Sequence, residues 1–176
     1  MVTLGTAVAM ERQDAGLSRS ALTCPLEPLT LPLFAATPAA TIGTPMPADT
    51  QSAGAEPPAE VRDQIADSVD VIVACANTGE PRFAYAIFSD RYLAGLFTGD
   101  GAAYQPAFER ELTQQATPPA APLELQELRS VRLLPDGRAV VELVLAADTT
   151  LTDTLVLVQD GGYWLVDDVV DLSPPA

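Results

Sequence analysis

Histidine is absent from this chain of 176 residues, and all 9 of its basic residues are arginine. The lack of histidine removes the commonest general base and the commonest metal ligand from any site that the chain builds. Only 2 cysteines are present, and two thiols without histidine do not complete a structural zinc site. No apolar run reaches the ~18 residues that a membrane-spanning helix needs.

Basic residues are also scarce relative to acidic ones, with 9 against 24, which gives a formal net charge of -15. A surface this negative repels phosphate groups, so nucleic acid and anionic lipid are excluded as partners of the bulk surface. The acidic excess has a simple explanation, because it keeps a chain with 48% hydrophobic residues in solution. The alternative is a surface suited to a cationic partner.

The two cysteines, Cys24 and Cys75, form either one disulfide or two separate buried thiols, since free cysteine is often buried. Cys24 opens a strip rich in proline and leucine, and Cys75 lies at the edge of the apolar face of a predicted helix. We therefore predict a disulfide that attaches the strip to the domain. A disulfide favours an exported location, although residues 2–10 lack the basic start of a signal peptide, and a cytoplasmic location stays open.

Composition divides the chain into three parts. Residues 1–59 form an N-terminal tail and an Ala/Thr/Pro-rich linker, for which we expect a largely extended or disordered conformation. Residues 60–172 carry the periodic apolar patterns of a folded domain. Residues 173–176 are a short C-terminal tail.

Helical spacing predicts three helices in the first half of the domain. The first covers residues 58–77, the second residues 81–89 and the third residues 104–115. Residues 91–97 are interpreted as a short strand or turn. The apolar stripe of the first helix consists of Val61, Ile65, Val69, Ile72 and Ala76.

From residue 123 onwards the apolar pattern changes to a period of two, which predicts four strands. They cover residues 123–133, 139–146, 152–159 and 163–172, and Gly-containing turns separate the first from the second and the third from the fourth. Residues 139–146 are almost all apolar, so both faces of that strand are expected to be buried. The predicted fold class is α+β, with three N-terminal helices packed on a curved, mostly antiparallel sheet.

Three short motifs resemble a known superfamily. They are Asn77-Thr78-Gly79-Glu80 between the first two helices, Phe88-Ser89-Asp90, and Gly162-Tyr163-Trp164-Leu165-Val166 on the last strand. Their order over residues 60–172 is similar to that of the nuclear transport factor 2-like superfamily, which includes SnoaL-like cyclases and ketosteroid isomerase. The resemblance implies a cone-shaped α+β domain. It also implies a pocket at the open end of the cone and a homodimer through the outer face of the sheet.

The resemblance implies only weak catalytic candidates. Enzymes of the superfamily carry an acid or a histidine at the pocket, but residues 92–96 hold no acid. What remains is Asp90 and Asp168, and strand alternation predicts that Asp168 points inward beside Trp164. The alternative is that Asp168 reaches solvent near the strand end. The residues predicted for a ligand pocket are Tyr85, Phe88, Tyr92, Trp164 and Asp168.

The neighbouring acids Asp167, Asp168 and Asp171 are interpreted as strand surface, because alternation separates them onto different faces. We expect no metal and no cofactor. The preferred function is a non-catalytic, exported or envelope-associated domain that binds a small apolar ligand or a protein partner. The alternatives are an isomerase, dehydratase or hydrolase that uses Asp90 or Asp168, and a dimerisation module. The content of the pocket distinguishes them, since a pocket filled by side chains favours protein interaction.

Overall fold

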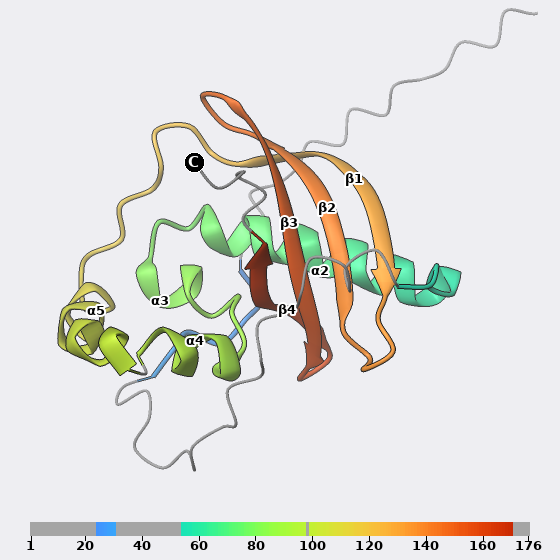
Figure 1. Ribbon diagram of the computed structural model, residues 1–176. Coiled ribbons are helices and arrows are strands. Elements are labelled where there is room, and N and C mark those ends of the chain that lie inside the picture. Colours follow the sequence, from blue (N-terminus) through green and yellow to red (C-terminus); the bar gives the residue numbers. More distant parts are fainter. Residues whose placement is uncertain (1–23, 31–53, 98, 171–176) are drawn as a thin grey trace, which may run out of the picture.

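The structure is a computed structural model that describes residues 24–30, 54–97 and 99–170, and these residues form an α+β fold (Figure 1). Four antiparallel strands make one sheet in the order β1-β2-β3-β4, so each strand pairs with the next one along the chain. The strands are β1 (Glu124–Leu133), β2 (Ala139–Ala146), β3 (Thr150–Asp160) and β4 (Tyr163–Val170). The predicted order of strands is therefore confirmed, and each described strand end lies within two residues of its prediction.

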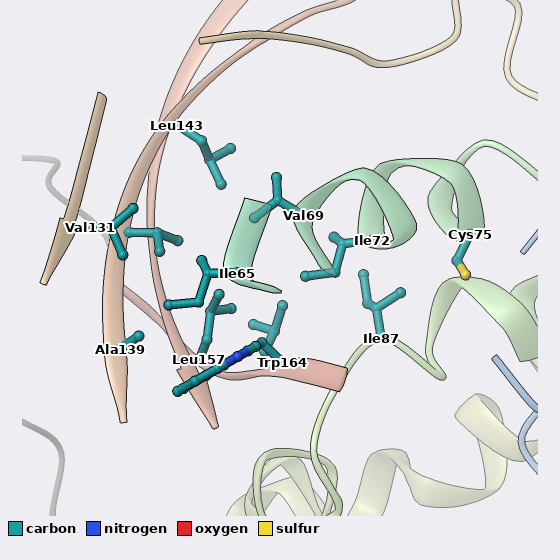
Figure 2. Packing of buried hydrophobic residues seen from close by; sticks show 12 residues of the cluster. Ile65, Val69, Ile72, Cys75, Ile87, Val131, Ala139, Leu143, Leu157 and Trp164 are labelled. Carbon is teal, nitrogen blue, oxygen red and sulfur yellow. The ribbon is translucent and has the colours of Figure 1, made fainter. Parts of the chain in front are cut away.

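Helix α2 (Ala59–Ala76) lies across one face of this curved sheet (Figure 1). The buried stripe of α2 includes Ile65, Val69 and Ile72, which point at the sheet (Figure 2). Opposite them lie Leu143 and Trp164, and all of these side chains belong to one buried cluster. The helical period of α2 and the alternation of the strands thus meet in a single main core.

Strand β2 is buried along most of its length, as its continuous apolar sequence predicts. Residues that face α2, such as Val141, belong to the main core. On the other face, Val140 packs with Leu134, Val156 and Val170 in a smaller cluster. Both faces of the strand therefore carry apolar contacts.

Within the described residues, no helix is long and apolar enough to cross a bilayer.

The junction after α2 fixes the path of a distant segment. Gly79 has a φ of 67°, and a Cβ there would lie 2.3 Å from the carbonyl oxygen of Thr117. The side chain of Asn77 pairs with the backbone of Leu123, donating to its carbonyl oxygen at 2.8 Å and accepting from its amide at 2.7 Å. These residues therefore hold the segment that leads into β1, which gives the Asn-Thr-Gly-Glu motif a structural role.

The second predicted helix is wrong in its extent, and the predicted strand or turn after it is a helix. Helix α3 (Pro81–Ala84) is short, and α4 (Asp90–Leu96) follows a turn. Helix α4 forms because the Ser89 side chain accepts a hydrogen bond from the Tyr92 amide, which caps the N-terminus. Ser89 is thus the capping residue of α4.

A second cluster lies under α3, α4, the 3-10 helix Gly99–Tyr104 and α5 (Gln105–Glu111), which together we call the helical lobe. Leu93, Phe108 and Leu112 are its buried members. The third predicted helix is shorter than expected, because its first residue belongs to the 3-10 helix and α5 ends at Glu111. Phe88 packs against both this cluster and the main core.

Residues 24–30 of the proline- and leucine-rich strip lie on the domain. Cys24 forms a disulfide with Cys75, as predicted, across a sequence separation of 51 residues. Leu26 packs on the main core, and Leu29 packs on the second cluster. The Leu29 amide donates to the carbonyl oxygen of Arg82 at 3.2 Å, and Arg82 Nε donates to the Leu29 carbonyl at 2.7 Å. The strip therefore connects the main core to the helical lobe.

Removal of the disulfide should lower the free energy of unfolding. The paired substitution Cys24→Ser/Cys75→Ser opens a loop of 51 residues. By the chain-entropy relation, closure of such a loop stabilises the folded state by about 4 kcal/mol. Denaturant unfolding of the oxidised wild type and the variant measures the difference. Added dithiothreitol is the control, because it should bring the wild type down to the variant. Equal stability of the two oxidised proteins would show that the disulfide does not restrain the unfolded chain.

Candidate functional site

A β-bulge in β4 places a buried carboxylate at the centre of a polar network. Leu157 of β3 pairs with Val166, but Val156 pairs with Asp168, so Asp167 is an extra residue without a partner in the ladder. A bulge of this kind bends the strand and redirects a side chain. Asp167 is 3% exposed, which corrects its interpretation as strand surface; Asp171 lies outside the described residues.

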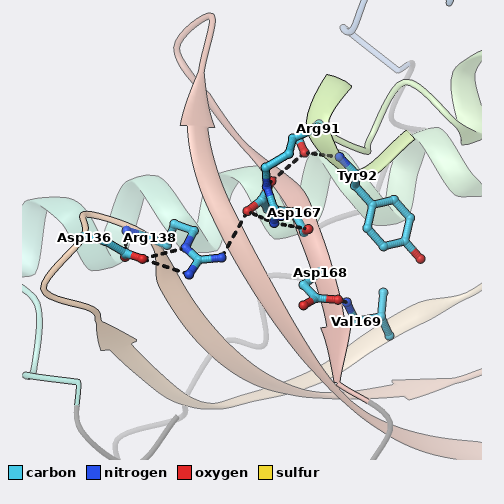
Figure 3. A network of polar contacts seen from close by, with 8 residues as sticks. Arg91, Tyr92, Asp136, Arg138, Asp167, Asp168 and Val169 are labelled. Carbon is cyan, nitrogen blue, oxygen red and sulfur yellow. Dashed lines mark hydrogen bonds and ion pairs between the residues drawn. The ribbon is translucent and has the colours of Figure 1, made fainter. Parts of the chain in front are cut away.

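The carboxylate of Asp167 is held by side chains from two other parts of the chain (Figure 3). Arg91 Nε donates to Asp167 Oδ1 at 2.8 Å, and Arg91 Nη2 contacts Oδ2 in the same pairing. Ser89 Oγ donates to Oδ1 at 2.7 Å, and Arg138 Nη1 donates to Oδ2 at 3.4 Å. Two arginines and a hydroxyl therefore surround one buried carboxylate, an arrangement that compensates for its loss of hydration.

Arg138 extends this arrangement towards the β1–β2 turn. Its Nη2 lies 2.8 Å from Asp136 Oδ2, and its amide donates to Asp136 Oδ1 at 3.1 Å. The network lines an open cleft of about 490 Å³ between the start of α4, this turn and the end of β3. The residues of the cleft are Ser89, Asp90, Arg91, Asp136, Arg138, Val158, Gln159, Asp160 and Asp167.

The environment lowers the pKa of both carboxylates in the network. Burial raises the pKa of Asp167, but the hydrogen bonds from Arg91 and Ser89 and the arginine charges outweigh it, so the net pKa is below the ordinary value. The hydrogen bond from Arg138 is the main cause of the lowered pKa of Asp136. Both groups are therefore ionised at neutral pH and are weak bases.

Asp168 lies on the face of the sheet opposite α2, which corrects the prediction that it points inward beside Trp164. The bulge at Asp167 is the reason, since one extra residue reverses the alternation that follows it. Asp168 lies near Tyr92. Burial is the main cause of the raised pKa of the Tyr92 phenol, and the negative charge of Asp168 is the second cause. Asp90 is exposed at the rim of the cleft.

The structure groups some of the predicted pocket residues and separates others. Phe88 and Tyr92 stack with ring centroids 4.9 Å apart. The ring centroids of Tyr85 and Phe88 are 6.2 Å apart. Tyr85 is half-buried in the helical lobe, where its hydroxyl donates to Glu111 at 3.2 Å. Trp164 is instead a member of the main core with 4% exposure. These aromatic side chains therefore serve two cores, with Phe88 between them.

Sequence reasoning did not find Arg91, Arg138 or the buried role of Asp167. Arg91 and Asp167 are 76 positions apart, and Arg138 and Asp167 are 29 apart, so no local spacing links them. One signal was available in the sequence, because Ser89 follows Phe88 in a pattern that permits an N-cap. A helix start there would have placed Arg91 in the first turn of α4.

Comparisons of the chain with known protein families, with curated proteins and with solved structures found no match.

Replacement of Asp167 by asparagine should destabilise the protein by about 3 kcal/mol, because it leaves the partly buried Arg91 without its carboxylate and removes the second ion pair of Arg138. The lowered pKa also sets the pH dependence. The stabilisation by ionised Asp167 is present above the unfolded pKa of ~3.9 and is lost as the pH falls through the lower, folded value. Unfolding measured from pH 7 to pH 3 should therefore show a flatter curve for Asp167→Asn than for the wild type.

Asp168→Asn is the matched control, since it removes the neighbouring carboxylate, which accepts a hydrogen bond only from the Val169 amide among the described side-chain contacts. We expect a change within about 0.5 kcal/mol, as for an ordinary surface substitution. If the two variants lose the same stability, the network around Asp167 does not hold the fold.

Proposed function

We propose that this chain is a non-catalytic domain of the nuclear transport factor 2-like type that binds a protein partner. The observation that carries the proposal is the filling of the space between α2 and the sheet. Ile65, Val69 and Leu157 are each 0% exposed there, and Leu143 and Trp164 are 2% and 4% exposed. Side chains of the chain itself occupy the face on which a ligand pocket of a cone would open (Figure 2), which favours a partner bound at the outer surface.

The cone assignment rests on the three motifs of the sequence and on two features of the fold. An amphipathic helix, α2, covers one face of a curved meander of four strands. The Asn-Thr-Gly-Glu and Phe-Ser-Asp motifs both lie at junctions where distant segments meet, at Leu123 and Val166 respectively. These features support the assignment without giving a function, because one fold hosts many functions.

The positions of the acidic residues support a non-catalytic role. A general base works best when its pKa lies near the working pH and when it faces a pocket. Asp167 has a lowered pKa and is bound by two arginines. Asp168 lies on the sheet face opposite the main core, and Asp90 is exposed. None of these geometries resembles a carboxylate in an apolar pocket, which the enzyme hypothesis requires.

The disulfide between Cys24 and Cys75 supports an exported or envelope-associated location. Disulfides persist in oxidising compartments and are rare in the cytosol. The net charge of -15 is consistent with a partner that carries basic groups.

Trp164 is the only tryptophan, so its fluorescence reports on the main core. We expect no change in the emission of the wild type when benzene or a steroid is added, because the described side chains around Trp164 are almost fully buried. Leu143→Ala is the positive control: it should cost about 2–5 kcal/mol and leave an apolar cavity that admits benzene. A saturable response of the wild type would contradict the proposal in favour of an apolar ligand.

The enzyme hypothesis has its own test. Turnover of ketosteroid or epoxide substrates that Asp90→Asn or Asp168→Asn abolishes would establish an enzyme.

Partner binding is tested by photo-crosslinking of the full chain in cells that produce it. A benzophenone residue is placed at Tyr104 or Leu96 in the helical lobe, or at Leu151 on β3, positions that are 70%, 42% and 46% exposed. We expect one protein to be crosslinked from one of these faces and not from the others. Crosslinking that is uniform, or absent from every face, would contradict a specific protein partner.

A further inference from the structure

The cleft beside the Asp167 network has a volume of about 490 Å³, and six of its nine lining residues are charged. Its size lies within the range of ~300–1,000 Å³ that is typical of binding pockets. Three separate segments form it: the start of α4, the β1–β2 turn, and the end of β3. The Asp167 network joins the first two segments to β4, and β4 pairs with β3.

The charged residues of the cleft fall into two sets. In the first set, Arg91 and Arg138 are balanced by Asp167 and Asp136, to which they are paired. In the second set, at the rim, Asp90 and Asp160 are exposed. Within the described residues, no arginine lies within ion-pair distance of Asp90 or Asp160. Among the described residues, Asp90 and Asp160 are therefore carboxylates of the cleft without an ion-pair partner, and they belong to different elements.

This distribution selects the class of ligand. An anion would meet arginines whose charge is already neutralised, together with a repulsive rim. Among the described residues, no group of three or more metal-ligating side chains is close enough to hold a metal ion. An organic cation, which can donate hydrogen bonds to carboxylates, matches the negative charge of Asp90 and Asp160. Lysine and arginine side chains have this chemistry.

We propose that this cleft receives a basic side chain, arginine or lysine, of the partner protein. The inference rests on the proposed function, since it names the chemistry of the partner at one point of contact. An open cleft of this kind leaves part of its occupant in solvent, whereas pockets for free small molecules bury most of the ligand. A side chain that enters from a larger partner needs no such enclosure. A bound partner surface excludes water from the cleft, which strengthens the attraction of the rim carboxylates.

The test uses the full chain, labelled with ¹⁵N, and two probes of equal size: N-acetyl-arginine amide and N-acetyl-citrulline amide. The citrulline probe is the neutral counterpart of the arginine probe. We expect saturable shifts of the backbone amides of Asp90, Gln159 and Asp160 with the arginine probe, weakened at least threefold in 0.5 M salt because exposed charges are screened. N-acetyl-lysine amide is a second arm, and binding of either basic probe supports the proposal.

Asp90→Asn/Asp160→Asn removes the rim charge at two exposed positions and should lower the affinity for the arginine probe about tenfold or more. The matched control is Asp63→Asn/Asp67→Asn on the exposed face of α2, which changes the net charge equally and should alter the affinity less than twofold. Equal losses in the two variants, or equal shifts with the citrulline probe, would overturn the proposal. This outcome is distinguishable from a failure of the proposed function. If the basic probes do not bind but the Trp164 emission still shows a closed core, only the proposal about the cleft is rejected.

Discussion

The buried carboxylate of Asp167 is the interaction on which the arrangement of the two cores depends. It draws Arg91 from α4 and Arg138 from the β1–β2 turn to one point of β4. Ser89 adds a second link, because the hydroxyl that donates to Asp167 also accepts from the Tyr92 amide and so starts α4. A charge of this kind is costly to bury and costly to leave unpaired. The bulge, the helix start and the turn therefore form one unit.

This unit also explains why the helical lobe lies against the edge of the sheet. Next to the Asp167 network, the Ser89 amide donates to the Val166 carbonyl oxygen at 2.8 Å, and the Val166 amide donates to the Ile87 carbonyl oxygen at 2.8 Å. These bonds cover part of the outer edge of β4, which would otherwise offer unpaired backbone groups. Phe88, between the two bonded residues, packs into both clusters. Backbone pairing, apolar packing and the ion pairs thus act at the same short segment.

The strands and α2 could be predicted from the sequence because their signals are local. Alternation from residue 123 onwards, glycines in the turns and the apolar stripe of α2 each depend on residues a few positions apart. The disulfide was predicted from the places of Cys24 and Cys75 relative to that stripe. The bulge could not be predicted, since nothing in the sequence of β4 marks Asp167 as an extra residue. The predicted direction of the Asp168 side chain was wrong for this reason. The pairing of Arg91 with Asp167 is equally hidden, because 9 arginines and 24 acids allow many combinations.

The parallel bridge between Phe88 and Val166 has a consequence for biosynthesis. Ser89 and Asp167 are 78 positions apart, which corresponds to roughly 4–16 seconds of translation at ~5–20 residues per second. During this interval the apolar residues of α3 and α4 have left the ribosome without the strand that completes their surroundings. The nascent chain therefore exposes the side of Phe88 that packs on the main core until β4 emerges, and a chaperone that holds this segment would cover that exposed ring in the meantime.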